Sequence, residues 1–321
     1  MNDNIWYEYF IETLYKKFPK KTKLTKALTQ LLVLEREAVY RRLRQEVYFS
    51  AHEIVKIATA WNISLDEISH VNSEQYSFQM KQINYIEPSK KEVEFLRTVI
   101  RGLYALQNAA DTEFMNICNK LPRQILAGFE YLNQFYLFKE RYQYYSCDKT
   151  VIPFSKTIIS KEKKIITEEY NRAIKCVPQS NFIFDKLLFE YFIKDIQYFH
   201  SIRLITDEEK ELLKQDLHNL LDYLLEIANH GCYPETQNKV NIYISELNID
   251  TNFSYSFSPD SKVCFVHAFE KLEIFTYNSE MVNKFKAWMQ IKKKTSNQIS
   301  EVDERSRVEF FIRQRQIIDS L

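Results

Sequence analysis

Residues 35–45 read Glu-Arg-Glu-Ala-Val-Tyr-Arg-Arg-Leu-Arg-Gln, a pattern that predicts one helix with two very different faces. At helical spacing the apolar side chains fall on one face: Ala38, Val39 and Leu43. The opposite face carries Arg36, Tyr40, Arg41 and Arg44, with Arg42 at the border between the two faces. We therefore expect a helix over about 35–44 that packs through its apolar side and presents a cationic side to solvent.

An apolar helix is expected directly before this cationic helix. Residues 24–32 read Leu-Thr-Lys-Ala-Leu-Thr-Gln-Leu-Leu, and only Val33 and Leu34 separate the two predicted helices. A helix, a tight turn and a second helix with a cationic outer face form the arrangement that places side chains in a DNA major groove. The pattern therefore predicts a helix-turn-helix unit with a recognition helix over about Glu35–Arg44.

Positive charge is concentrated around these two helices. From Leu14 to Lys56 there are eleven Lys and Arg against four Glu and no Asp, although the whole chain has a net charge of +1. Lys and Arg that neutralise phosphates supply most of the non-specific affinity for DNA, so this excess suits a polyanionic partner. We predict base-facing roles for Arg36, Tyr40, Arg41 and Arg44. We predict phosphate contacts for Lys21, Lys23, Lys26 and Arg42.

Helices are also expected on both sides of the helix-turn-helix. Residues 4–18 predict a helix that covers the next two, with an apolar face of Ile5, Trp6, Tyr9, Phe10, Leu14 and Phe18. Ser50-Ala-His-Glu53 has the form of a capping box and opens another helix. These elements complete a helical domain over residues 1–70.

Residues 20–68 resemble the lambda-repressor-like (Xre-type) helix-turn-helix. Val-Tyr-Arg-Arg-Leu-Arg at 39–44, followed by Ile-Ser-Leu-Asp at 63–66, resembles one group of uncharacterised bacterial transcriptional regulators. The resemblance implies a compact helical bundle that binds double-stranded DNA. Regulators of this class dock as symmetric pairs on two half-sites about one helical turn apart, so it also implies a homodimer.

Three positions depart from the family pattern. Val33 and Gln45 stand where glycine is usual, and Glu35 stands where a helix-capping serine is usual. A left-handed backbone costs a residue other than glycine roughly 1 kcal/mol or more, so the turn could be reshaped. A carboxylate at Glu35 also repels a nearby phosphate. A second interpretation therefore stays open: a protein-interaction or signalling module whose helix-turn-helix no longer binds DNA.

The rest of the chain predicts a larger second unit. Residues 71–88 resemble a linker with at most one short strand, and residues 89–232 are expected to be helical apart from one apolar piece at 114–118 that suits a strand or a helix. Residues 239–277 alternate with a period of two, which predicts a small antiparallel sheet, and two helices are expected within 279–320. The fold class is therefore mainly α, α+β overall. This body at 89–321 resembles the same regulators at 184–231, in the predicted strands of 239–277 and at 299–311, and the resemblance implies architecture but no ligand.

Several functional classes are disfavoured by the residues present. Three isolated glycines exclude the common nucleotide-binding loops, and no serine sits in a nucleophile elbow. The five cysteines form no CxxC pair, and the spacing of His218, His230 and Cys232 matches no standard zinc site. No stretch approaches the roughly 18 apolar residues of a membrane helix. We expect a cytoplasmic protein that is not an enzyme, with no cofactor, metal or membrane.

The body is rich in aromatic residues. The chain contains 23 Phe and 21 Tyr. Rings and phenolic hydroxyls could line a pocket for a small apolar or amphipathic effector, but they also suit ordinary core packing and a dimer interface. The sequence leaves these three alternatives open, with core packing favoured over a pocket.

Overall fold

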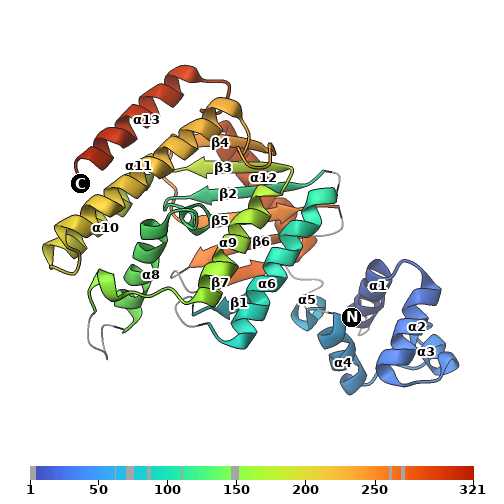
Figure 1. Cartoon of the computed structure of the whole chain (residues 1–321). Coiled ribbons are helices and arrows are strands. Elements are labelled where there is room, and N and C mark those ends of the chain that lie inside the picture. The colour runs from blue at the N-terminus through green and yellow to red at the C-terminus, as the bar shows by residue number, and fades with distance from the viewer. Residues whose placement is uncertain are drawn as a thin grey trace. The chain divides into compact units, whose positions relative to one another are not determined.

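The structure is a computed structural model that describes residues 5–61, 63–69, 76–84, 88–109, 111–145, 152–259, 262–268 and 272–321. The chain divides into two compact units, residues 1–78 and 79–321. Both units contain helices, and the second also contains a sheet, so the α+β class is confirmed (Figure 1).

The amino-terminal unit is a bundle of short helices around one apolar core. Its helices are α1 Ile5–Lys17, α2 Lys21–Leu32, α3 Arg36–Leu43, α4 Ala51–Trp61 and α5 Leu65–Ser69. Every one of these helices except the short α5 contributes at least two fully or nearly fully buried apolar side chains. The apolar periodicity of the sequence therefore predicts the helices correctly.

The inner face of α1 differs from the prediction. Tyr7 is fully buried, whereas Trp6 is 44% exposed. The amide of Phe49 donates a hydrogen bond of 2.9 Å to the Tyr7 phenolic oxygen. Hydrophobicity favours Trp6 over the more polar Tyr7 as the buried residue. The hydroxyl of Tyr7 is nevertheless satisfied by a backbone partner 42 residues further along the chain, so Tyr7 can be buried.

The body is built on one eight-stranded mixed sheet with the strand order β1-β7-β6-β5-β2-β3-β4-β8. The strands are β1 Gln79–Gln82, β2 Glu113–Cys118, β3 Gln179–Phe184, β4 Lys239–Ser245, β5 Asn252–Phe257, β6 Lys262–Ala268, β7 Leu272–Thr276 and β8 Ser296–Gln298. Strands β2, β3 and β4 are parallel neighbours, and all other pairs are antiparallel. Helical segments connect the parallel strands, as such crossovers require.

The prediction of a small antiparallel sheet is therefore wrong in size and type. Strand β3 lies inside the stretch 89–232 that was expected to be helical. Strand β4 pairs with β3 and β8, so only β5, β6 and β7 form the predicted meander. Parallel strands that are covered on both faces lack the alternation that reveals a half-buried strand, and five of the six residues of β3 are buried.

Helices cover both faces of the sheet. They are α6 Lys90–Ala105, α7 Arg123–Leu126, α8 Glu130–Tyr145, α9 Lys161–Lys175, α10 Leu188–Ser201, α11 Asp207–His230, α12 Ser279–Lys294 and α13 Glu304–Asp319, with 3₁₀ turns at Leu106–Asn108 and Phe154–Lys156. Figure 1 shows α6 and α9 in front of the sheet and α12 behind it. On β4, Ile242 lines the same cavity as residues of α11. The next residue, Tyr243, lies with its ring centroid 4.9 Å from Lys293 Nζ of α12. Because adjacent strand residues point to opposite faces, α11 and α12 cover different faces.

Much of the aromatic content is core packing. Phe135 and Phe138 of α8 pack edge-to-face on Phe199 of α10, with ring centroids 5.9 and 4.8 Å apart. All three rings are nearly inaccessible to solvent. Edge-to-face packing is the geometry that aromatic quadrupoles prefer. These rings therefore hold the helices of the body together and do not line a pocket.

Two further expectations concern the described residues only. No helix in those ranges is long and apolar enough to cross a bilayer. Cys118, Cys176, Cys232 and Cys264 are free thiols, and Cys147 lies outside the described residues.

Candidate nucleic-acid interface

The turn between α2 and α3 has left-handed backbone at the residue where glycine is usual. Val33 has φ 56° and ψ 47°, and its amide donates to the carbonyl of Thr29 at the end of α2. The Val33 side chain is 85% exposed, so it gains little from packing. A β-branched residue in this conformation is strained. Gln45, the other non-glycine departure, is also left-handed, with φ 64°. The turn before α3 and the loop after it therefore keep the left-handed backbone at these two positions and accept strain there.

Helix α3 separates its apolar and cationic side chains as the spacing predicts. Val39 and Leu43 are buried in the core of the amino-terminal unit, whereas Arg36, Arg41 and Arg44 are exposed and Tyr40 is partly exposed. Glu35 precedes the helix with extended backbone and makes no side-chain capping bond. The helix thus presents several cations at the surface, and their partners decide which of them a polyanion could use.

The strongest cationic feature is a patch formed by Lys21, Arg36 and Tyr40. Arg36 Nη2 donates a 3.1 Å hydrogen bond to the Tyr40 hydroxyl, and its guanidinium carbon lies 5.5 Å from the ring centroid. Lys21 Nζ, from the start of α2, lies 5.9 Å from the same ring. The Arg36 hydrogen bond is the largest cause of a lowered Tyr40 pKa, and the charge of Lys21 adds to it. The patch therefore joins α2 and the first turns of α3.

Arg41 and Arg44 differ from Arg36 because carboxylates lie beside them. Arg44 forms 2.9 Å ion pairs with both Glu37 and Glu46, and Arg41 lies 3.6 Å from Glu46. These side chains are about half exposed or more. Exposed pairs of this kind contribute only about 0–1 kcal/mol, so a phosphate could displace the carboxylates. Glu37 and Glu46 nevertheless reduce the positive potential at this end of α3.

Arg42 has a structural role and does not fit the predicted phosphate contact. Its guanidinium forms a two-bond pair with Glu53, with Nη2–Oε1 3.0 Å and Nε–Oε2 3.2 Å, and Nη1 donates to the carbonyl of Ala38. Burial would raise the pKa of Glu53, but hydrogen bonds from the Ser50 amide and from Arg42 outweigh it and lower the pKa. A phosphate contact would require Arg42 to leave a largely buried carboxylate, which is costly.

Lys23 and Lys26 complete the predicted set on α2. Both are exposed. Within residues 5–61, neither Lys23 nor Lys26 takes part in an ion pair, and the same is true of Lys21 and Arg36. These four cations are therefore available to an external anion without the loss of an internal salt bridge.

No protein-family model and no curated protein matches this chain.

A serine, a histidine and a glutamate lie in line on the body sheet, and sequence reasoning missed them. Ser254 Oγ is 3.0 Å from His267 Nε2, and His267 Nδ1 is 2.8 Å from Glu273 Oε2. This order resembles a nucleophilic triad. Ser254, however, is only 4% exposed, so a substrate cannot reach its hydroxyl. Burial lowers the pKa of His267, but the charge of Glu273 outweighs it and raises the pKa, which favours a cation over a general base. We assign the three residues to sheet stability.

Another buried polar group of the body is Lys163 of α9. It is 2% exposed, and Glu140 of α8 is fully buried. Burial and the charge of Arg123 lower the pKa of Lys163 to about 5, although Glu140 opposes the shift. A lysine this inaccessible to solvent suits an internal polar network better than a binding site. Among the described residues, no group of three His, Cys, Asp or Glu side chains could hold a metal ion.

Proposed function

We propose that the amino-terminal unit binds double-stranded DNA through α3 and that the protein is a sequence-specific transcriptional regulator. The observation that carries this proposal is the patch of Lys21, Arg36 and Tyr40, which has no internal carboxylate partner within residues 5–61. Residues at the start of a recognition helix are the ones that reach base edges, and Arg36 is the first residue of α3. The patch thus offers positive charge where such a helix meets the groove.

The cations of the unit have different roles under this proposal. Arg36 contacts a guanine edge, and Lys21, Lys23 and Lys26 hold phosphates that set the register. Arg41 and Arg44 are peripheral, because Glu37 and Glu46 neutralise part of their charge. Two copies of the chain bind as a symmetric pair, which the resemblance to lambda-repressor-like regulators implies.

The test begins with selection of bound fragments from random duplex DNA by the full chain. Binding of the recovered duplex is then followed by fluorescence anisotropy. A good bidentate arginine–guanine contact contributes roughly 1–3 kcal/mol, so Arg36→Ala should weaken binding about 5- to 150-fold per head and relax the sequence preference at one position of each half-site. Arg44→Ala is the matched control on the same helix, and it should weaken binding by less than about threefold. Equal losses for the two variants would contradict the proposed roles.

The salt dependence tests the lysine contacts separately. Three phosphate contacts per head, six for the symmetric pair, predict a slope of roughly −5 in a plot of log binding constant against log salt concentration. Replacement of Lys23 by Gln should reduce that slope by about one per head. A slope near zero would remove the phosphate contacts from the proposal.

The carboxylates beside Arg41 and Arg44 favour a second candidate function. A head whose cations are paired internally suits a protein-interaction or signalling module that has lost DNA binding. Such a module would bind no duplex from the random pool, even at low salt.

A further inference from the structure

The body contains a small cavity between helices α7, α9 and α11 and strands β3 and β4. Its floor is apolar and is formed by Ile174, Phe182, Leu224, Ile227, Val240 and Ile242. The volume open to the centre of a water molecule is about 20 Å³, which accommodates one or two water molecules or a short alkyl group. An apolar floor disfavours ordered water, because a buried water needs two to four polar partners.

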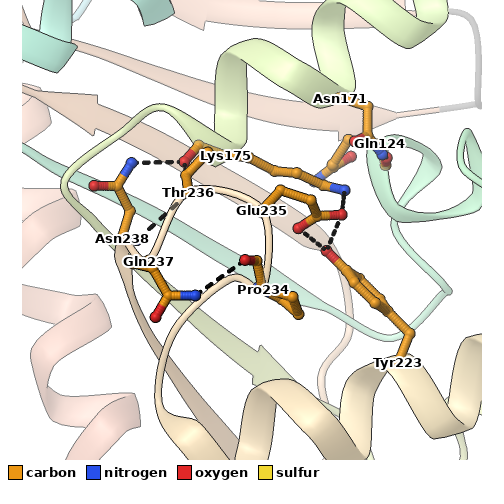
Figure 2. Close-up of polar contacts among 9 residues, drawn as sticks. All are labelled: Gln124, Asn171, Lys175, Tyr223, Pro234, Glu235, Thr236, Gln237 and Asn238. Atoms are coloured by element: carbon orange, nitrogen blue, oxygen red, sulfur yellow. Dashed lines mark hydrogen bonds and ion pairs between the residues drawn. The ribbon is translucent and has the colours of Figure 1, made fainter.

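Polar side chains gather at the mouth of this cavity. Lys175 and Tyr223 line it, and Glu235 bridges them from the loop before β4 (Figure 2). Lys175 Nζ lies 2.7 Å from Glu235 Oε1, and the Tyr223 hydroxyl donates to Glu235 Oε2 over 3.1 Å. Lys175 Nζ also lies 5.0 Å from the centroid of the Tyr223 ring. An ammonium, a phenolic hydroxyl and an aromatic face therefore hold one carboxylate above an apolar floor.

Lys175 is more buried than its partner Glu235. The Lys175 side chain is 18% exposed, whereas that of Glu235 is 48% exposed. The carbonyl of Lys175 accepts hydrogen bonds from Thr236 and Asn238, so the loop stays anchored without its carboxylate. Glu235 is half exposed and can return to water, and an incoming carboxylate would keep Lys175 paired, so exchange of the two carboxylates costs little.

We propose that this cavity binds a short aliphatic monocarboxylate of about two to four carbons, whose carboxylate replaces that of Glu235 between Lys175 and Tyr223 and whose alkyl chain enters the apolar floor. The site already accepts a carboxylate at its mouth, which identifies the anion. The cavity volume sets the chain length, because each added methylene gains apolar burial only while the floor has room for it. The site is argued from the body alone and does not depend on DNA binding by the head.

The proposal is tested on the full chain with linear carboxylates from acetate to hexanoate, at constant ionic strength. Binding is followed by NMR of protein labelled at the isoleucine δ1 methyl groups, since Ile174, Ile227 and Ile242 line the cavity. We expect saturable shifts of these methyl signals with one site per chain. Affinity should rise up to about four carbons and then fall, and butanol should bind more weakly than butyrate. Absence of saturable shifts at these methyl groups, or an affinity independent of chain length, would overturn the proposal.

Two variants separate the ligand site from general effects on the fold. Lys175→Met should weaken butyrate binding roughly tenfold or more, because a charge-assisted hydrogen bond is lost. Glu235→Gln should strengthen it several-fold, because the competing carboxylate disappears while Lys175 and Tyr223 remain. Lys186→Met is the matched control, since Lys186 pairs with Glu246 elsewhere in the body, and it should leave binding unchanged. Weaker binding in Glu235→Gln would refute the displacement, and that variant stays informative if Lys175→Met fails to fold.

Discussion

Replacement of Arg42 by methionine tests whether this residue stabilises the head or contacts DNA. Methionine keeps the apolar stem of the side chain but removes two charge-assisted hydrogen bonds to Glu53, of 3.0 and 3.2 Å. Hydrogen bonds to charged groups contribute about 1.5–3 kcal/mol, and breaking a fully buried pair costs about 3–5 kcal/mol. The two side chains keep 18% and 14% exposure, so water partly compensates Glu53. We expect the free energy of unfolding of the head to fall by about 2 kcal/mol.

Hydrogen–deuterium exchange of the full chain, read by mass spectrometry, measures this loss in the head and the body separately. A loss of about 2 kcal/mol corresponds to roughly 30-fold faster exchange in peptides from α3 and α4, with body peptides unchanged. The double variant Arg42→Met/Glu53→Gln should recover about half of the loss, because a neutral amide needs no counter-ion and its oxygen still accepts the Ser50 amide. Exchange within twofold of the wild type in Arg42→Met would refute the structural role of Arg42.

The same pair predicts a dependence on pH. The pKa of Glu53 is lowered in the folded head, so its carboxylate stabilises the head above the ordinary carboxyl pKa of about 4.3. That stabilisation is lost as the pH falls through the lowered value. The difference in unfolding free energy between wild type and Arg42→Met should therefore shrink below about pH 4. A difference that is constant from pH 7 to pH 3 would contradict this origin.

Two further predictions concern the turn and the sheet. Val33→Gly relieves left-handed strain of about 1–2 kcal/mol, and the added backbone entropy of glycine costs about 0.5–1 kcal/mol. Peptides from α2 and α3 should therefore exchange roughly two- to fivefold more slowly. Faster exchange would show that the exposed valine contributes packing. Glu273 raises the pKa of His267, so the pair of protonated His267 and Glu273 stabilises the body fully below about pH 6.5. This stabilisation is lost as the pH rises through the raised pKa of His267. Calorimetry of the full chain should show a fall in body stability over this rise that is absent in His267→Gln, and identical pH profiles would exclude the pair as its source.

The helical head was predictable because its determinants are local. Apolar spacing revealed α1 to α4, and the border position of Arg42 between two faces of α3 was visible in the sequence. Its partner was not visible, because Glu53 lies eleven residues away on α4 and reads as a simple capping residue. Glu53 performs both roles at once, since it also accepts the amide of Ser50. Sequence reasoning therefore placed Arg42 in the correct helix but missed its ion pair with Glu53.

The body was less predictable because its central strands lack a periodic signal. Strands β2 and β3 are buried on both faces, and their polar residues Asn116, Ser180 and Asn181 interrupt the apolar runs. Such short segments cannot be distinguished from parts of helices by spacing. Once β2 and β3 are inserted between β5 and β4, the predicted meander is divided and the sheet becomes mixed.

The sequence by itself determined helices α2 and α3, the two faces of the cationic helix α3 and the concentration of positive charge around them. These properties depend on residues within a few turns of one another, and every helix shares the same backbone geometry. Only the tertiary structure decided which cations have no carboxylate partner within residues 5–61, as at Arg36, and which are paired with one, as at Arg42. It alone also brought Lys175 and Glu235, sixty residues apart, to the mouth of one cavity. The physical reason is that such pairings depend on how whole elements pack together, and no local pattern of side chains encodes that packing.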